Sequence, residues 1–288
     1  MLQVARLAPR LLGESRELCL DFVARQRHPE GGFRNRAGDP DLYYTVFGCD
    51  CLIALRADVP VAPLVAFLAP LGEGEGLDFV HLCCLARVWA ALPREVRPAA
   101  TLARIAARLA SFRAADGGFA PAPGAAHGSV YAAFLALGAY QDCGAALPEP
   151  ERLLASLADL RAADGGFANQ PASREGVTTA TAAAVMLLRH LEGSAPAELA
   201  EWLLARHYPR GGFFASPSAP APDLLSTATA LHALAALHVP LDPIREPCLD
   251  FLDSLWCNRG GFYGHWADDA LDCEYLFYAL LALGHLAV

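Results

Sequence analysis

The chain has 288 residues, of which 55% are hydrophobic and 18% are charged, and this balance excludes an intrinsically disordered protein. The formal net charge of -9 argues against a nucleic-acid partner, because contacts to phosphates need an excess of basic side chains. No apolar run reaches the roughly 20 residues that a transmembrane helix needs. Nine scattered cysteines without a C-x-x-C pair indicate reduced thiols, so we expect a cytoplasmic protein without a membrane span.

Gly-Gly-Phe recurs along the chain, and its spacing predicts an internal repeat. The three later intervals between copies are 48, 46 and 49 residues, and the first interval, 86, is close to twice 43. The glycine-rich segment 72–76 lies near the middle of the long interval and is interpreted as a degenerate copy. The sequence therefore predicts a single domain, residues 1–288, built from six repeats of about 43–49 residues. The five intact copies begin at Gly31, Gly117, Gly165, Gly211 and Gly260.

Each repeat contains two segments of different polarity. The first, such as 153–161, has apolar residues at spacings of three and four, which predicts an amphipathic helix. Gly-Gly-Phe then ends the helix, since glycine adopts positive φ and the Phe can pack back on the core. After a polar loop comes a nearly all-apolar segment, which predicts a helix buried on every side. The predicted inner helices are 41–56, 78–92, 125–140, 175–191, 223–238 and 269–286.

Six outer and six inner helices predict an all-α fold, an α6/α6 toroid. A superhelical solenoid is the alternative, but solenoids need polar caps at their ends. The last segment, 279–283, is fully apolar, which favours a closed ring.

Acidic residues recur where the inner helices are expected to begin. Such residues can cap helices, because their carboxylates accept hydrogen bonds from free backbone amides. In a toroid all inner helices begin at one mouth, so the same residues would also ring the opening of a central cavity. Counted back from the apolar ends, the positions are Asp41, Asp78, Pro123, Glu175, Asp223 and Asp269.

Three further groups of residues are candidates for binding or catalysis. His81, one turn after Asp78, is either a metal ligand or general base, or a buried histidine with one partner. Arg34 and Arg36 precede Tyr43 and Tyr44 in the first repeat, which suits a diphosphate beside an aromatic wall. The alternative for these arginines is a solvated loop paired with Asp39. The loop of the sixth repeat is densest in titratable groups, with His265, Trp266, Asp268, Asp269, Asp272 and Cys273.

A family resemblance appears at these residues. Gly-Gly-Phe loops ahead of segments such as 41–48, Asp-Leu-Tyr-Tyr-Thr-Val-Phe-Gly, resemble the terpenoid cyclase and protein prenyltransferase superfamily. The segment 41–48 is most similar to a repeat of the β subunit of Rab geranylgeranyl transferase. The resemblance spans nearly the whole chain and implies the toroid fold.

The resemblance also implies roles for single residues. In that family Asp-x-Cys and the His of Asp-x-x-His hold zinc, which would make Asp41 and His81 metal ligands. Arg36 would bind the isoprenoid diphosphate, with Tyr44 and Phe47 at aromatic positions. This chain has Tyr43 where the family has Cys, and we therefore expect no tightly bound zinc.

The cyclase relatives use Asp-x-Asp-Asp as a protonating acid. That motif is absent here, which leaves Asp269 and Asp272 as the candidate acids and His265 and Trp266 as neighbouring substrate-binding residues. Residues 268–272 also fit D-D-x-x-D, a magnesium-diphosphate pattern, and magnesium is a second possible cofactor.

The expected function is that of an enzyme that binds an isoprenoid diphosphate in a central apolar cavity, for prenyl transfer or for cyclisation. Transfer would involve a peptide substrate, with a second helical subunit as a further possible partner. A non-catalytic toroid that binds a lipid or a protein is the first alternative. A toroid that processes glycans with paired carboxylates is the second.

Overall fold

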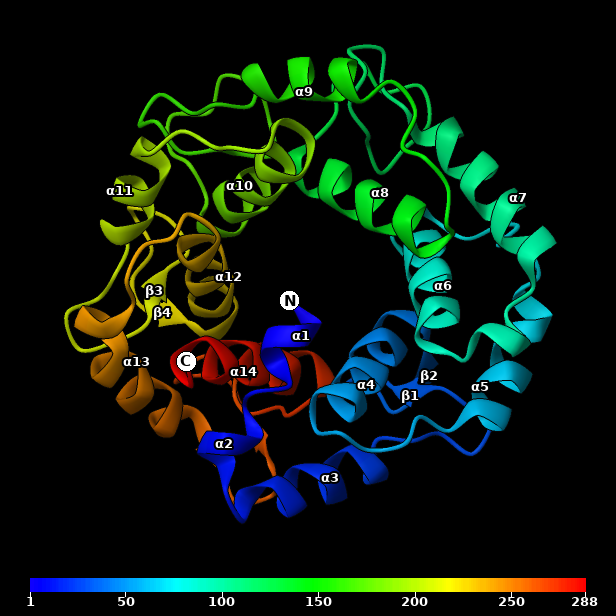
Figure 1. Ribbon diagram of the computed structural model, residues 1–288, viewed down its shortest axis with the longest axis horizontal. Helices are drawn as coiled ribbons and strands as arrows, with labels where there is room; N and C mark the ends of the chain where they lie inside the picture. The colour runs from blue at the N-terminus through cyan, green and yellow to red at the C-terminus, as the bar shows by residue number, and fades with distance from the viewer.

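Six apolar helices stand side by side as the inner layer of a closed ring in the computed structural model of residues 1–288 (Figure 1). Each inner helix contacts the next, and the last contacts the first, so the ring closes. Leu280, Leu281 and Ala282 of the last helix are fully buried at this closure. The closed toroid predicted from the repeat is therefore confirmed. The inner helices are α4 (Leu42–Ala54), α6 (Phe79–Ala91), α8 (Val130–Asp142), α10 (Thr178–Glu192), α12 (Leu224–Ala236) and α14 (Cys273–Leu286).

Six further helices form the outer layer, each with one apolar stripe turned inward. In the outer helix α7, Leu102, Ile105, Ala106 and Leu109 are buried, at the spacing of three and four that places them on one face. Three 3-10 turns, η1 (Ala69–Leu71), η2 (Arg94–Val96) and η3 (Ala110–Phe112), extend the connections. The outer helices are α3 (Ser15–Arg25), α5 (Val61–Leu68), α7 (Ala99–Leu109), α9 (Pro150–Ala158), α11 (Glu198–Leu204) and α13 (Asp242–Leu255).

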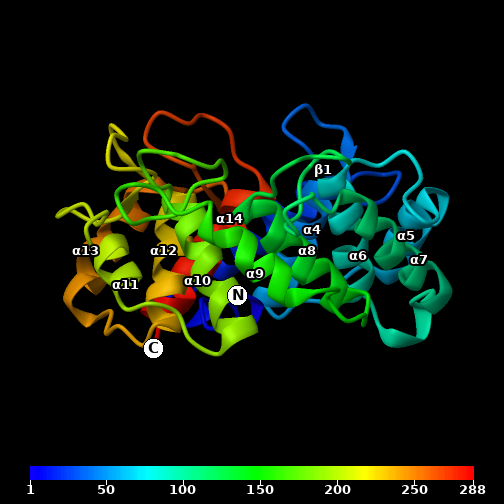
Figure 2. The ribbon, with the colours of Figure 1, turned by 90° about the horizontal axis from the view of Figure 1, so that it is seen from above.

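Two short helices, α1 (Leu2–Ala5) and α2 (Pro9–Leu12), precede the first repeat. Figure 1 shows α1 inside the ring, where it contacts α14 and α4. A Cβ at Gly284 would lie 2.2 Å from the carbonyl oxygen of Val4, so only glycine lets α1 approach α14 this closely. In Figure 2 the loops before the inner helices lie on one side of the ring, and both termini lie toward the other. None of the helices combines the length and the hydrophobicity of a membrane-spanning segment.

The buried Phe of each Gly-Gly-Phe joins the loop to the inner helix that follows. The backbone amide of Phe33 donates a hydrogen bond of 2.8 Å to Thr45 Oγ1, and the Phe33 ring covers Gly48. A Cβ at Gly48 would lie 2.4 Å from that ring. All five phenylalanines are buried, as predicted: Phe33, Phe119, Phe167, Phe213 and Phe262.

Short antiparallel strand pairs hold several of these loops. β1 (Phe33–Arg34) pairs with β2 (Pro40–Asp41), and β3 (Phe213–Phe214) pairs with β4 (Pro222–Asp223). β5 (Trp256–Cys257) pairs with β6 (Gly261–Phe262). The pairs β1–β2 and β3–β4 both end on an aspartate that caps the next inner helix, so the loop fixes where that helix begins.

The predicted starts of the inner helices are correct in three repeats and wrong in three. Asp41, Asp78 and Asp223 each accept a hydrogen bond from the backbone amide three residues later. Pro123, Glu175 and Asp269 lie instead in the preceding loops. The prediction counted a fixed length back from each apolar end, but the inner helices differ in length and in where they end. The residues that occupy the cap position in those three repeats are Ser129, Val177 and Asp272.

Candidate functional site

All six inner helices and residues 1–3 enclose a central cavity of about 500 Å³. Its lining contains 16 hydrophobic residues out of 23, which makes it a site for a largely apolar ligand. The lining runs from Tyr43 in the first turn of α4 to Asp50 in its third turn. Seven residues of helix correspond to about 10 Å, so the cavity follows much of the ring's depth.

Aromatic rings cover one wall of the cavity near the mouth where the inner helices begin. Phe47 contacts Tyr43, Phe277 and Tyr278, with ring centroids 5.0, 5.9 and 5.6 Å apart. Tyr131, on α8, belongs to the same lining. The faces of such rings attract a positive charge, so this wall can stabilise a cation within an apolar space.

A carboxylic acid stands beside this aromatic wall. Glu274 lies one turn before Phe277 and Tyr278 on the same face of α14, and it accepts a hydrogen bond of 2.7 Å from the Tyr43 hydroxyl. Burial raises the pKa of Glu274, and the hydrogen bond from Tyr43 only partly offsets this effect. The carboxyl group therefore holds a proton to a higher pH than an exposed glutamate does.

Glu274 was missed by the sequence analysis. It is the second residue after the helix cap Asp272, as Tyr43 is the second residue after the cap Asp41. The signal was present in this shared register, but the alignment placed Asp269 at the start of α14 and hid the match.

Arg36 is held by two acidic residues of the sixth repeat. Its Nε lies 2.7 Å from Asp272 Oδ2, and its Nη2 lies 3.1 Å from Asp268 Oδ2. The other oxygen of Asp272 accepts the backbone amide of Tyr275 and caps α14. Burial acts to raise the pKa of Asp268, but hydrogen bonds from Ala270 and Arg36 outweigh it and hold that pKa below its usual value. The guanidinium thus occupies the space between the outer aspartates of the D-D-x-x-D pattern, so these side chains do not fit magnesium.

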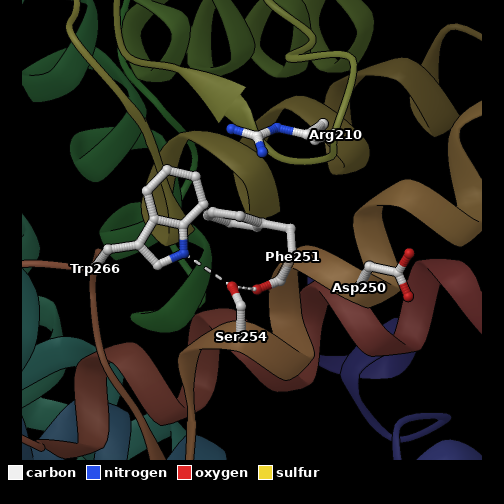
Figure 3. Close-up of a pocket in the computed structure, with 5 residues that line it drawn as sticks. All are labelled: Arg210, Asp250, Phe251, Ser254 and Trp266. Atoms are coloured by element: carbon white, nitrogen blue, oxygen red, sulfur yellow. Dashed lines mark hydrogen bonds between the residues drawn. The ribbon is translucent and has the colours of Figure 1, made fainter.

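The other candidates from the sixth repeat are not brought to the cavity. Asp269 and His265 are exposed on the loop before α14. Trp266 is 51% exposed, packs against Phe251 and donates a hydrogen bond of 2.9 Å to Ser254 Oγ (Figure 3). Trp266, Phe251 and Ser254 line a surface pocket separate from the central cavity. Arg210 and Asp250 complete its lining.

Some of the candidates from the first repeat line the cavity, and others do not. Tyr43 and Phe47 line the cavity, and Tyr44 packs edge-on against Tyr43. Arg34 donates a hydrogen bond of 2.8 Å to the carbonyl of Gly38 within its own loop.

Asp41 and His81 face one another across neighbouring inner helices, as their matching positions predicted. His81 Nε2 lies 3.8 Å from Asp41 Oδ2, and His81 Nδ1 lies 2.9 Å from Asp78. The third place of a zinc site would fall to Tyr43, whose hydroxyl is bound to Glu274 and whose pKa is raised by burial. No group of three or more His, Cys, Asp or Glu side chains lies within reach of one ion. The donor set at this place does not fit zinc, which needs three or four protein ligands.

The opposite end of the cavity is polar. Asp50, Arg87 and Asp142 come from three consecutive inner helices and line the cavity together. His232 Nδ1 and His285 Nε2 lie 2.9 Å apart nearby on α12 and α14. We call the group Asp50, Arg87 and Asp142 the floor cluster. Sequence reasoning did not identify it, although three charged residues inside otherwise apolar helices are a visible signal.

The buried histidine pair should make the stability of the folded protein depend on pH. Burial lowers the pKa of His232 to about 3 and that of His285 to about 4. An unfolded histidine titrates near 6.5, so below that pH the unfolded chain binds more protons and stability is lost as pH falls. We expect the free energy of unfolding to fall by about 1 kcal/mol per pH unit for each histidine between pH 6 and 5.

Urea unfolding of the wild type and of His232→Gln at several pH values checks this expectation. The variant should show a shallower dependence on pH, because one of the two titrating groups is gone. Identical slopes in the two proteins would contradict the assignment.

Comparisons with known proteins agree with the ring. The family model of the prenyltransferase alpha-alpha toroid domain matches residues 2–214 and 180–287. A variant of the type II terpene cyclase MstE from Scytonema, in complex with geranylgeranyl dihydroxybenzoate, is 14% identical, with a TM-score of 0.63 and 97% of each chain covered. No curated protein matches the sequence.

Two other solved structures share the fold. Protein geranylgeranyltransferase-I from Candida albicans, complexed with GGPP, is 18% identical with a TM-score of 0.53, covering 97% of this chain and 82% of that one. A polysaccharide lyase is 11% identical with a TM-score of 0.54, covering 95% and 96%. Because three different activities occur on this ring, the likeness establishes the fold and leaves the reaction to the site. On the match to the family model, the chain belongs to the prenyltransferase alpha-alpha toroid domain family.

Proposed function

We propose that the protein binds an isoprenoid chain in the central cavity and cyclises it by proton transfer from Glu274. The observation that carries this proposal is the hydrogen bond to Glu274 from Tyr43, an aromatic residue of the cavity lining. A protonated carboxylic acid supplies the proton, and the rings of Tyr43, Phe47 and Tyr278 surround the space where positive charge develops.

The chemistry balances without a co-reactant. The Glu274 carboxyl protonates a terminal carbon–carbon double bond, which leaves a tertiary carbocation. A second double bond of the same chain attacks that cation, forms a carbon–carbon bond and moves the charge along. Loss of a proton from a neighbouring carbon to water gives a new double bond, so the product is a cyclic isomer of the substrate. Water at the mouth can return a proton to Glu274 for the next turnover.

The diphosphate expected from the sequence has weaker support than the isoprenoid chain. Arg36 already pairs with Asp268 and Asp272, so a diphosphate would have to displace two carboxylates from it. Asp41 and Asp78 add further negative charge at the same mouth. These charges favour a substrate that presents its hydrocarbon end to the mouth.

Isotope incorporation tests the proposal directly. We expect incubation of the protein with a linear C20 prenyl alcohol in D₂O to yield a cyclic product that carries one deuterium on carbon. Gas chromatography with mass spectrometry detects both the ring and the label. A bound but unchanged alcohol would refute cyclisation and support the alternative of a binding toroid.

A further inference from the structure

We infer that the floor cluster is a binding site for a hydroxyl head group, so the ligand is a prenyl chain that ends in an alcohol or a phenol. This inference rests on the proposed isoprenoid-binding cavity and adds the chemical class of the ligand's polar end. Its basis is the incomplete pairing of three charged side chains that line the cavity.

The ion pairs of the floor cluster are long. The Arg87 guanidinium lies 3.4 Å from Asp50 Oδ2 and 3.3 Å from Asp142 Oδ1. Charge-assisted bonds of this kind are usually about 2.7–2.9 Å, and the Arg36–Asp272 bond of the same protein is 2.7 Å. The guanidinium therefore lies between two carboxylates without closing tightly on either of them.

Polar capacity at the floor also remains unused. The side chain of Asp50 is only 6% exposed, yet its Oδ1 accepts no hydrogen bond. The side chain of Arg87 is 38% exposed although it lies inside the ring, because its accessible surface faces the cavity. Burial raises the pKa of Asp50 and of Asp142 in spite of the neighbouring arginine. Buried polar groups are normally paired, so the floor cluster has capacity for a further hydrogen-bond partner.

A hydroxyl group has the chemistry of such a partner. It can donate to an oxygen of Asp50 or Asp142 and accept from Arg87 at the same time. A diphosphate is a poor match, because two carboxylates face one guanidinium, which leaves no excess of positive charge. A head group at the floor also directs the far end of the chain toward Glu274, since Asp50 and Tyr43 are seven residues apart on α4, about 10 Å.

Calorimetry with three ligands of equal chain length tests the inference on the full protein. The ligands are geranylgeraniol, geranylgeranyl diphosphate and a C20 isoprenoid hydrocarbon without a head group, each in the same detergent. We expect the alcohol to bind about tenfold or more tightly than the hydrocarbon, as a hydrogen bond to a charged group allows. The diphosphate should bind more weakly than the alcohol.

Asp50→Leu should lower the affinity for the alcohol about tenfold and leave the hydrocarbon unchanged. This variant keeps one carboxylate, Asp142, against Arg87, so no charge is left without a partner. Asp21→Leu, on the exposed face of α3, is the matched control and should bind all three ligands as the wild type does. Arg87→Gln is the second variant and removes the positive charge of the floor cluster. The thermal unfolding temperature of this variant, compared with that of the wild type, shows whether the ring stays folded.

The outcomes separate this inference from the proposed function. Equal affinity for alcohol and hydrocarbon, or an unchanged Asp50→Leu, would overturn the floor site and leave chain binding intact. Tightest binding of the diphosphate would overturn it as well. If none of the three ligands binds, the isoprenoid-binding cavity itself is refuted.

Discussion

Glu274→Gln is expected to lower cyclic product formation about 1,000-fold while the isoprenoid chain still binds. The amide has nearly the shape of the carboxyl group but cannot release a proton, and general acids contribute about 10²–10⁴ to rates. Tyr43 can still donate its hydrogen bond to the amide oxygen, so the cavity wall should stay in place. Single-turnover product analysis, together with calorimetry of chain binding, measures the two effects separately.

Two further variants sharpen this test. Asp269→Asn changes an exposed acid of the same repeat and should leave the rate unchanged. Tyr43→Phe removes the hydrogen bond that lowers the pKa of Glu274, so the acid should stay protonated to higher pH. The fall in rate with rising pH should therefore move to higher pH. Full activity of Glu274→Gln, or loss of activity in Asp269→Asn, would assign the acid to another residue.

Gly211→Ala is expected to destabilise the ring by about 4 kcal/mol, combining a strained backbone with overpacking. Gly211 has φ of 98°, a conformation that residues with a side chain rarely adopt. A Cβ there would lie 1.7 Å from the carbonyl oxygen of Pro247, in the outer helix α13. Backbone cannot move away as the end of a flexible side chain can, so the helix or the loop must shift.

The repeat provides a matched control for this substitution. Gly165 is the equivalent glycine of the preceding repeat, with φ of 90° and no atom within 4 Å of its ideal Cβ. Gly165→Ala should therefore cost only the backbone strain, about 1–2 kcal/mol. Urea unfolding of both variants isolates the close contact from the strain. Equal losses of stability would mean that α13 and the loop separate at little cost.

Much of the ring could be predicted from the sequence because the same pattern of an amphipathic and an apolar segment recurs six times. The alternation of amphipathic and apolar segments follows from burial, and each Gly-Gly-Phe ends a helix by glycine's backbone freedom and places a buried Phe. The short helix α1 lies outside the repeats, so the repeat pattern does not predict its position. Its position inside the ring depends on the approach to Gly284, a contact between opposite ends of the chain.

The candidate site was predicted only where its residues share a register. Asp41 and His81 hold matching positions in consecutive repeats, and the structure brings them within 3.8 Å. Glu274 was missed because an alignment on apolar ends was off by three residues in the sixth repeat, which hid the register that Glu274 shares with Tyr43. The pairing of Arg36 with Asp268 and Asp272 joins residues more than 230 positions apart, and local patterns carry no information about such contacts.

The sequence by itself determined the layers, the number of repeats and the apolar character of the cavity, since these depend on hydrophobic periodicity and glycine, which act locally. Tertiary structure decided which polar groups meet. Closure of the ring sets Glu274 of the last helix against Tyr43 of the first, and it gathers Asp50, Arg87 and Asp142 from three helices at one end. Hydrogen bonds and ion pairs act over a few ångströms, so their partners are fixed only once the ring has closed.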